Sequence, residues 1–90
     1  MKIPKSIKVG TLTYKVEIAD NVNEDEGDLG VVDHGKLLIR IQKGSHSMMT
    51  NTLLHEIFHT FNSEFKDETI VQCFADRMQL LLKDNSGIFE

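Results

Sequence analysis

The chain has 90 residues, 40% of them hydrophobic, with one cysteine and a formal net charge of −4. This length predicts a single domain, residues 1–90, close to the smallest size at which one apolar core suffices. The negative charge argues against nucleic acid or an anionic membrane as the main partner, and one cysteine cannot form an internal disulfide. The first ten residues lack an apolar run long enough for a signal peptide or a membrane span, so we expect a cytoplasmic protein.

Residues 1–44 are predicted to form an antiparallel β-sheet of about four strands. Apolar side chains alternate along residues 12–18, and residues 5–9 precede them across a turn that contains Gly10. The stretch 19–30 is rich in Asp, Glu, Asn and Gly. It lacks the ligand spacing of a calcium-binding EF-hand loop, so we expect a solvated loop rather than a metal site.

A second hairpin is predicted from residues 29–33 and 36–42, with Gly35 taking a positive φ in the turn between them. His34 lies at this turn, where we expect it to be exposed and where it could contact a substrate. Residues 36–41 leave two interpretations open. They form either an interior strand or an edge strand to which a peptide substrate can add by backbone hydrogen bonds.

Residues 45–65 are predicted to form a helix of roughly five turns, because no proline or glycine interrupts them. Ser45 offers an N-cap after Gly44, and His46 flanks the start of the helix, where it too could contact a substrate. Apolar residues recur at three- and four-residue steps, which is the period of a helix with one apolar face. These residues are Leu54, Ile57, Phe58, Phe61 and Phe65.

The most specific motif of the chain is His55-Glu56-Ile57-Phe58-His59, which reads H-E-x-x-H. Two histidines four residues apart lie on one helix face, so both imidazoles can bind one metal ion. Glu56 lies about 100° round the helix from His55, where it can reach a metal-bound water without ligating the metal. Zinc makes such a water nucleophilic near neutral pH, and the carboxylate can take its proton. The pattern can also arise by chance in a metal-free protein, but its helical context favours a site.

A catalytic zinc ion usually has three protein ligands and a water. No histidine follows His59, and Asn62 and Phe65 occupy the positions of the glycine and histidine that metzincins require, which excludes that class. The carboxylates that remain as a third ligand are Glu64, Glu68 and Asp76.

A second helix, antiparallel to the first, is predicted to start near Asp67, which is a good N-cap, and residues 85–90 form a tail. Glu68 then lies in its first turn, near His59, and is favoured as the third ligand. Cys73 falls in an amphipathic stripe and is predicted to be a core thiol rather than a ligand. The other members of this stripe are Ile70, Val71, Phe74, Met78 and Leu81.

The H-E-x-x-H motif and the run from Glu68 to Ala75 together resemble the ImmA/IrrE-type zinc metallopeptidases. The pattern of that family is H-E-x-x-H followed by a helix reading E-x-x-A-N-x-F-A. Glu68, Phe74 and Ala75 match it, whereas Val71 and Gln72 replace the small residue and the asparagine. Residues 1–4 and 33–37 also resemble short phage and prophage proteins of this group. The resemblance implies a gluzincin-like site with Glu68 as third ligand, in a protein of the bacterial host cytoplasm.

These observations predict an α+β protein with a minimal zincin-like fold, whose helical half at residues 45–84 carries the metal site. The predicted function is that of a zinc-dependent metallopeptidase acting on a peptide or protein substrate. Zn²⁺ held by His55, His59 and Glu68 would polarise the peptide carbonyl. Glu56 would act as general base toward the water and then protonate the leaving amine.

Two functional assignments have alternatives. Tyr14 and His46 are both candidates for the donor that stabilises the oxyanion, and the sequence does not choose between them. The alternative function is a non-catalytic zinc-binding or protein-interaction module of a phage or prophage that retains the zincin fold. The small size of the chain favours this alternative, because no second lobe is present in these 90 residues to wall a substrate cleft.

Overall fold

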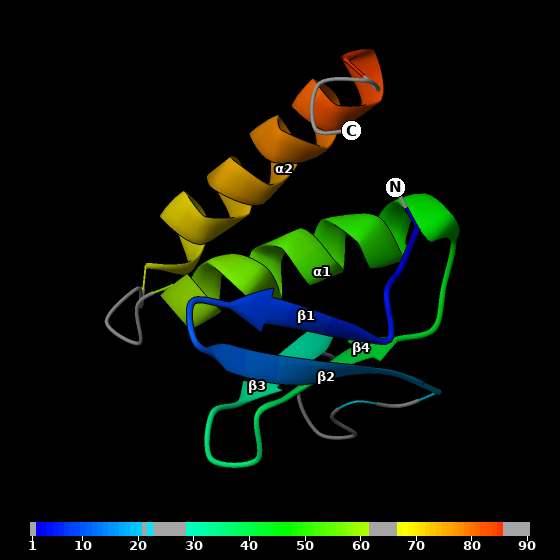
Figure 1. Cartoon of the computed structure of the whole chain (residues 1–90). Coiled ribbons are helices and arrows are strands. Elements are labelled where there is room, and N and C mark those ends of the chain that lie inside the picture. The colour runs from blue at the N-terminus through cyan, green and yellow to red at the C-terminus, as the bar shows by residue number, and fades with distance from the viewer. Residues whose placement is uncertain (1, 21, 23–28, 62–66, 86–90) are drawn as a thin grey trace.

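The part of the chain that the structure describes contains four strands followed by two helices, in the order predicted for an α+β protein (Figure 1). The computed structural model describes residues 2–20, 22, 29–61 and 67–85. Most of the acidic stretch 19–30 and all of residues 86–90 therefore lie outside the described residues. The elements are β1 (Ser6–Val9), β2 (Leu12–Ala19), β3 (Gly30–Asp33), β4 (Leu38–Gln42), α1 (His46–Phe61) and α2 (Glu68–Asp84).

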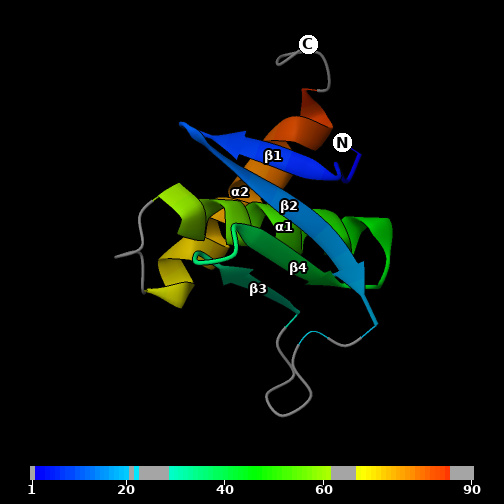
Figure 2. The same cartoon turned by 60° about the horizontal axis from the view of Figure 1, so that its bottom comes forward.

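The sheet is mixed, so the prediction of an antiparallel sheet is wrong for one strand pair. Its strand order is β1-β2-β4-β3, and β2 pairs with β4 in parallel (Figure 2). The two predicted hairpins, β1–β2 and β3–β4, are antiparallel as expected. The second hairpin lies with its more apolar strand, β4, against β2. This places the fully buried Ile39 and Ile41 at the centre of the sheet and leaves β3 at its edge.

The turn between β3 and β4 also differs from the prediction. Leu37, with a φ of 52°, takes the left-handed conformation, and Gly35 does not. The Asp33 carboxylate accepts a hydrogen bond from the Lys36 backbone N–H at 3.0 Å within this turn, and β4 begins at Leu38, two residues later than expected. In the first hairpin, Gly10 does take a positive φ, of 62°. Because β4 is interior, residues 36–41 cannot be the strand to which a substrate adds.

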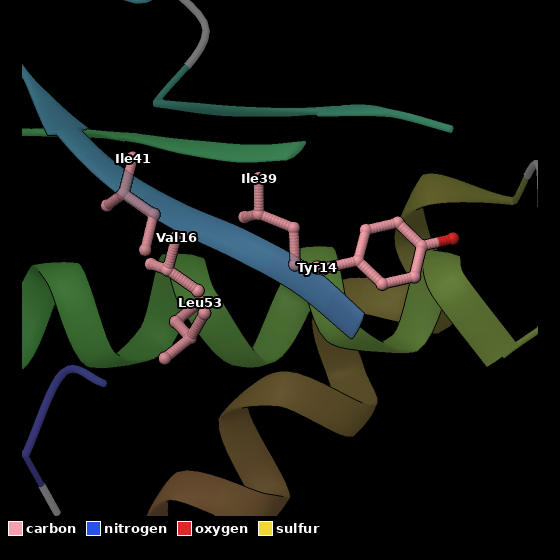
Figure 3. Close-up of a cluster of buried hydrophobic side chains, with 5 residues drawn as sticks. All are labelled: Tyr14, Val16, Ile39, Ile41 and Leu53. Atoms are coloured by element: carbon pink, nitrogen blue, oxygen red, sulfur yellow. The ribbon is translucent and has the colours of Figure 1, made fainter. Parts of the chain in front are cut away.

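The apolar core lies between α1 and one face of the sheet (Figure 3). Ile39 and Ile41 of β4 are fully buried against Leu53 of α1, and Tyr14 and Val16 of β2 complete the cluster. Leu53 lies outside the predicted apolar stripe of this helix. The helix face that α1 packs against the sheet is therefore adjacent to the apolar face predicted from the spacing of its residues.

The second helix packs on α1, which lies between α2 and the sheet (Figure 1). Val71 and Ala75 are buried in this contact, but Ile70 and Phe74 are 52% and 47% exposed. Cys73 is exposed as well, so its prediction as a core thiol is wrong. The physical reason is that α2 has one helix, α1, as its described neighbour. The contact with α1 buries only part of the apolar stripe that the sequence predicted for α2.

Both helix starts are capped as the sequence predicts. The Ser45 hydroxyl accepts a hydrogen bond from the Met48 backbone N–H at 3.1 Å. The Asp67 carboxylate accepts from two backbone N–H groups in the first turn of α2. The first helix ends at Phe61, and the remainder of its predicted span, residues 62–65, lies outside the described residues. In the described ranges, no helix has the length and apolar character needed to cross a bilayer.

Gly30 lets the edge strand β3 approach α1 closely. A Cβ atom at this position would lie 2.6 Å from Cγ2 of Thr52 and 3.0 Å from Cγ of Glu56. Real Cβ atoms do not come so near to other heavy atoms, so a side chain at position 30 would push apart β3 and the motif-bearing face of α1.

We therefore predict that Gly30→Ala lowers the free energy of unfolding by about 1–3 kcal/mol, as overpacking does in other proteins. Denaturant-induced unfolding measures this difference. Gly35→Ala is the matched control, because a Cβ there would meet Asp33 Oδ1 at 3.4 Å, an ordinary contact. We expect the control to stay within about 0.5 kcal/mol of the parent. Equal effects of the two substitutions would contradict the close approach of β3 to α1.

Candidate metal centre

A cleft of about 610 Å³ lies where the edge strand β3, helix α1 and the first turns of α2 meet. His55, Glu56 and His59 of the H-E-x-x-H motif line it from α1, and Glu68 and Gln72 line it from α2. The rings of the two histidines lie one helical turn apart, with centroids separated by 4.9 Å. The wall opposite α1 is formed by residues 29–32 and His34.

Three ligand atoms converge in this cleft. Nε2 of His55 lies 2.8 Å from Oε2 of Glu68, and Nε2 of His59 lies 3.2 Å from both of these atoms. Tetrahedral zinc, with bonds of about 2.0–2.1 Å, separates its ligand atoms by roughly 3.4 Å. The distance between the His55 and Glu68 atoms is shorter than this by about 0.6 Å, and the two other distances are shorter by about 0.2 Å. The side chain of Glu68 is 69% exposed, so no packing prevents the triangle from widening. His55, His59 and Glu68 could therefore hold a metal ion.

A chain of hydrogen bonds behind His55 determines how its ring is protonated. Nε2 of Gln72 lies 2.8 Å from the Asp76 carboxylate, and Oε1 of Gln72 lies 2.8 Å from Nδ1 of His55. An ionised carboxylate can only accept hydrogen bonds, so the Gln72 amide must present its NH₂ group to Asp76 and its oxygen to His55. The imidazole must then donate its Nδ1–H to Gln72.

This protonation has a direct consequence for the site. A neutral His55 that carries its proton on Nδ1 has a lone pair on Nε2, and this lone pair faces the Glu68 carboxylate at 2.8 Å. Two acceptors at that distance repel each other unless a cation lies between them. Metal-binding histidines commonly have this arrangement, with the second ring nitrogen donating to a fixed oxygen. The hydrogen bonds in the cleft thus favour a positive charge at the point where the three ligand atoms meet.

The same network joins the two helices along their length. Asn51 accepts a hydrogen bond from Gln72 at 2.8 Å and donates to Asp76 at 2.8 Å and to Gln79 at 3.0 Å. Gln79 in turn donates to the backbone carbonyl of Ser47 at 2.8 Å. Because these contacts pair early residues of α1 with late residues of α2, they confirm that the helices are antiparallel. They also fix the register in which Glu68 meets the histidines.

The pKa of Asp76 is held below its ordinary value of 3.8, first by the hydrogen bond from Asn51 and then by the one from Gln72. Both amides donate to the ionised form and therefore stabilise it. A depressed pKa means that Asp76 stays ionised from neutral pH down to about pH 5. The orientation of Gln72 is therefore constant over that range.

Glu56 differs from Glu68 in its surroundings. Its side chain is 8% exposed, and its Oε1 atom lies 4.0 Å from Nε2 of His55. It lines the cleft beside the three ligand atoms without belonging to the group that could hold a metal. This is the position that a group acting on a metal-bound water requires.

The other residues singled out in the sequence lie elsewhere. Asp76 contacts amides rather than the histidines, and Glu64 lies outside the described residues. His46 is exposed at the first residue of α1 and does not line the cleft, whereas His34 is exposed as predicted and does line it. Tyr14 is buried in the core, with its hydroxyl 3.3 Å from Nδ1 of His34.

Asn51 and Gln72 were not predicted from the sequence to be parts of the site. A usable signal was present, because Gln72 lies four residues after Glu68 and Asn51 lies four residues before His55. Residues at this spacing share a helix face. Polar amides in line with the ligands on two facing helices are therefore candidates for the groups that orient those ligands.

Comparison with known proteins gave no match to a protein-family model, a curated protein or a solved structure. The chemistry of the cleft is therefore inferred from its own residues. Two imidazoles and one carboxylate form a ligand set that suits zinc, and a separate buried carboxylate lies beside them.

The network makes a prediction about the pH dependence of stability in the metal-free protein. Because the folded pKa of Asp76 is depressed, its contribution to the free energy of unfolding is complete above about pH 4 and is lost as the pH falls through the folded pKa. The destabilisation caused by Asp76→Ala should therefore be constant from neutral pH to about pH 5 and should shrink below about pH 4. Urea unfolding of parent and variant, with chelator present, measures it.

The Asn51→Ala background provides the control for this measurement, because it removes the stronger of the two donors to Asp76. In that background, Asp76→Ala should lower the free energy of unfolding by less at neutral pH than it does in the parent. The size of this destabilisation should also vary less with pH. A destabilisation by Asp76→Ala that grows as the pH falls would contradict the network.

Proposed function

We propose that the protein is a zinc-dependent metallopeptidase. The observation that supports this most strongly is the convergence of Nε2 of His55, Nε2 of His59 and Oε2 of Glu68 beside the buried carboxylate of Glu56. Three protein ligands leave one tetrahedral position for a water or a substrate oxygen, which is typical of catalytic rather than structural zinc. The resemblance to ImmA/IrrE-type peptidases supports the same assignment.

In the proposed reaction the residues of the cleft have separate roles. His55, His59 and Glu68 would hold Zn²⁺, which supplies a Lewis acid and lowers the pKa of a bound water. Glu56 accepts a proton from the attacking water and returns a proton to the amine that leaves. Gln72 keeps the Nε2 lone pair of His55 directed at the metal by accepting its Nδ1–H.

The edge strand β3 offers a binding surface for the substrate in this proposal. Its residues line the cleft opposite the motif, and no strand among the described residues pairs with its outer edge. An extended peptide can add to such an edge by backbone hydrogen bonds. β3 thus takes the substrate-binding role that one interpretation of the sequence gave to residues 36–41.

A second candidate function is a non-catalytic zinc-binding or protein-interaction module. The exposed apolar side chains of α2, among them Ile70, Phe74 and Leu81, favour it because a partner could cover them. This candidate gives no role to the burial of Glu56 beside the ligand atoms. The two candidates therefore differ in whether Glu56 matters for anything beyond packing.

The proposal predicts that Glu56→Gln keeps its zinc and loses hydrolysis. The amide can hydrogen-bond to the water but cannot accept its proton, so kcat should fall by at least about 100-fold. Zinc content by elemental analysis and cleavage of fluorescein-labelled casein and of a mixed peptide library measure the two properties. Glu17→Gln is the matched control, because Glu17 pairs with Arg40 at 3.5 Å and does not line the cleft.

Three outcomes decide between the candidates. Parent protein that carries about one equivalent of zinc and cleaves peptides, with an inactive Glu56→Gln variant, supports the peptidase. Zinc-loaded parent that cleaves nothing in the library supports the interaction module. Parent that contains well under one equivalent of zinc and is not stabilised by added zinc contradicts the peptidase and the zinc-binding module, since a bound ligand must stabilise the folded state.

A further inference from the structure

His34 forms the end of the cleft wall opposite the metal-capable group. It lies in the turn that joins β3 to β4, and it lines the same cleft as His55, His59 and Glu68. It is not a member of the group that could hold the metal. The imidazole of His34 therefore borders the same space as the three side chains that could hold a metal.

The ring of His34 is connected to the apolar core through Tyr14. The Tyr14 hydroxyl lies 3.3 Å from Nδ1 of His34, and the two rings meet edge to face, at 85° with centroids 6.3 Å apart. Tyr14 is 3% exposed, so its ring is immobilised by the cluster around Ile39. Its hydroxyl points away from the other labelled side chains of that cluster (Figure 3). The core thereby presents a fixed polar atom to His34.

This contact selects one tautomer of the imidazole. A buried phenol hydroxyl needs an acceptor, and a neutral imidazole offers one ring nitrogen that can accept. When the Tyr14 hydroxyl donates to Nδ1, the proton of neutral His34 must be on Nε2. His34 then carries a hydrogen-bond donor on the ring atom that Tyr14 does not contact.

The side-chain amides and the threonine hydroxyl of the cleft already donate to other groups of the protein. Asn51 and Gln72 donate within the network that joins the helices, and the Thr52 hydroxyl donates to the backbone carbonyl of Met48 at 2.9 Å. The carboxylates of the cleft can only accept. Among the described residues, the polar contact recorded for His34 is the one with Tyr14. Nε2–H of His34 is thus a side-chain donor of the cleft that remains for an incoming ligand.

We propose that His34 is a catalytic residue that stabilises the oxyanion of the tetrahedral intermediate by donating a hydrogen bond from Nε2, and that Tyr14 is the positioning residue that holds the required tautomer. The proposal rests on the proposed peptidase function. No bond is formed or broken at His34, because the proton remains on Nε2 throughout. This assignment replaces the earlier choice between Tyr14 and His46 with a residue whose turn the sheet places at the cleft.

The test uses a phosphinic analogue of an alanine dipeptide. Its phosphinate group is tetrahedral and carries a negative charge on its oxygens, as the intermediate does. Calorimetric titration of the zinc-loaded full chain measures its affinity. We expect His34→Ala to weaken binding by about 10–100-fold, as loss of a hydrogen bond to a charged group does, with zinc affinity unchanged. His46→Ala is the matched control and should bind as the parent does, because His46 is exposed and does not line the cleft.

A second measurement tests the role of Tyr14 without metal or substrate. Tyr14→Phe keeps the core ring and removes the hydroxyl. Two-bond ¹H–¹⁵N spectra of the imidazoles report which nitrogen carries the proton. We expect His34 to be the Nε2–H tautomer in the parent and to move toward a mixture in Tyr14→Phe, with the other histidines unchanged.

The results separate this inference from the function on which it rests. Phosphinate affinity that is the same in His34→Ala and in the parent overturns the role of His34, even when the parent hydrolyses peptides. Failure of the parent to bind the phosphinate also overturns it. Loss of binding in His34→Ala supports it, whereas the proposed function is decided separately by zinc content and by the Glu56→Gln comparison.

Discussion

The hydrogen bond from Gln72 to Asp76 is the constraint on which the arrangement of the site depends. Because a carboxylate can only accept, Asp76 fixes the direction of the Gln72 amide, and the amide fixes the proton of His55 on Nδ1. The lone pair of Nε2 must then face Glu68 and His59. One ionised side chain thus sets the chemistry of a ligand atom that it does not touch, through a single intervening amide.

This constraint acts only because packing fixes the positions of the sheet, α1 and α2 relative to one another. Leu53 attaches α1 to the sheet, and Val71 attaches α2 to α1, both fully buried. Gly30 brings the edge strand β3 against the motif face of α1, so that this strand forms a wall of the cleft. The side chains that could hold a metal come from two helices, and the opposite wall comes from a strand. A site built in this way needs only one small sheet and two helices.

Local patterns predicted much of this structure. The alternation along β2, the Asp67 cap and the placing of His55 and His59 on one helix face all follow from spacing and side-chain chemistry within a few residues. The parallel pairing of β2 with β4 could not be predicted, because it depends on which strand of a distant hairpin is more apolar. The orienting role of Gln72 also escaped prediction, since it depends on the register between two helices. A short segment does not encode such long-range choices by itself.

The central claim is that Gln72 directs the lone pair of His55 toward the metal, and zinc affinity of Gln72→Met tests it most directly. The account predicts a loss of about 10–100-fold, the usual effect of removing a partner of a metal-binding histidine. Gln79→Met, which alters the same network near Ser47 and away from the ligands, should bind zinc about as tightly as the parent. Equal zinc affinity of Gln72→Met and the parent would contradict the account.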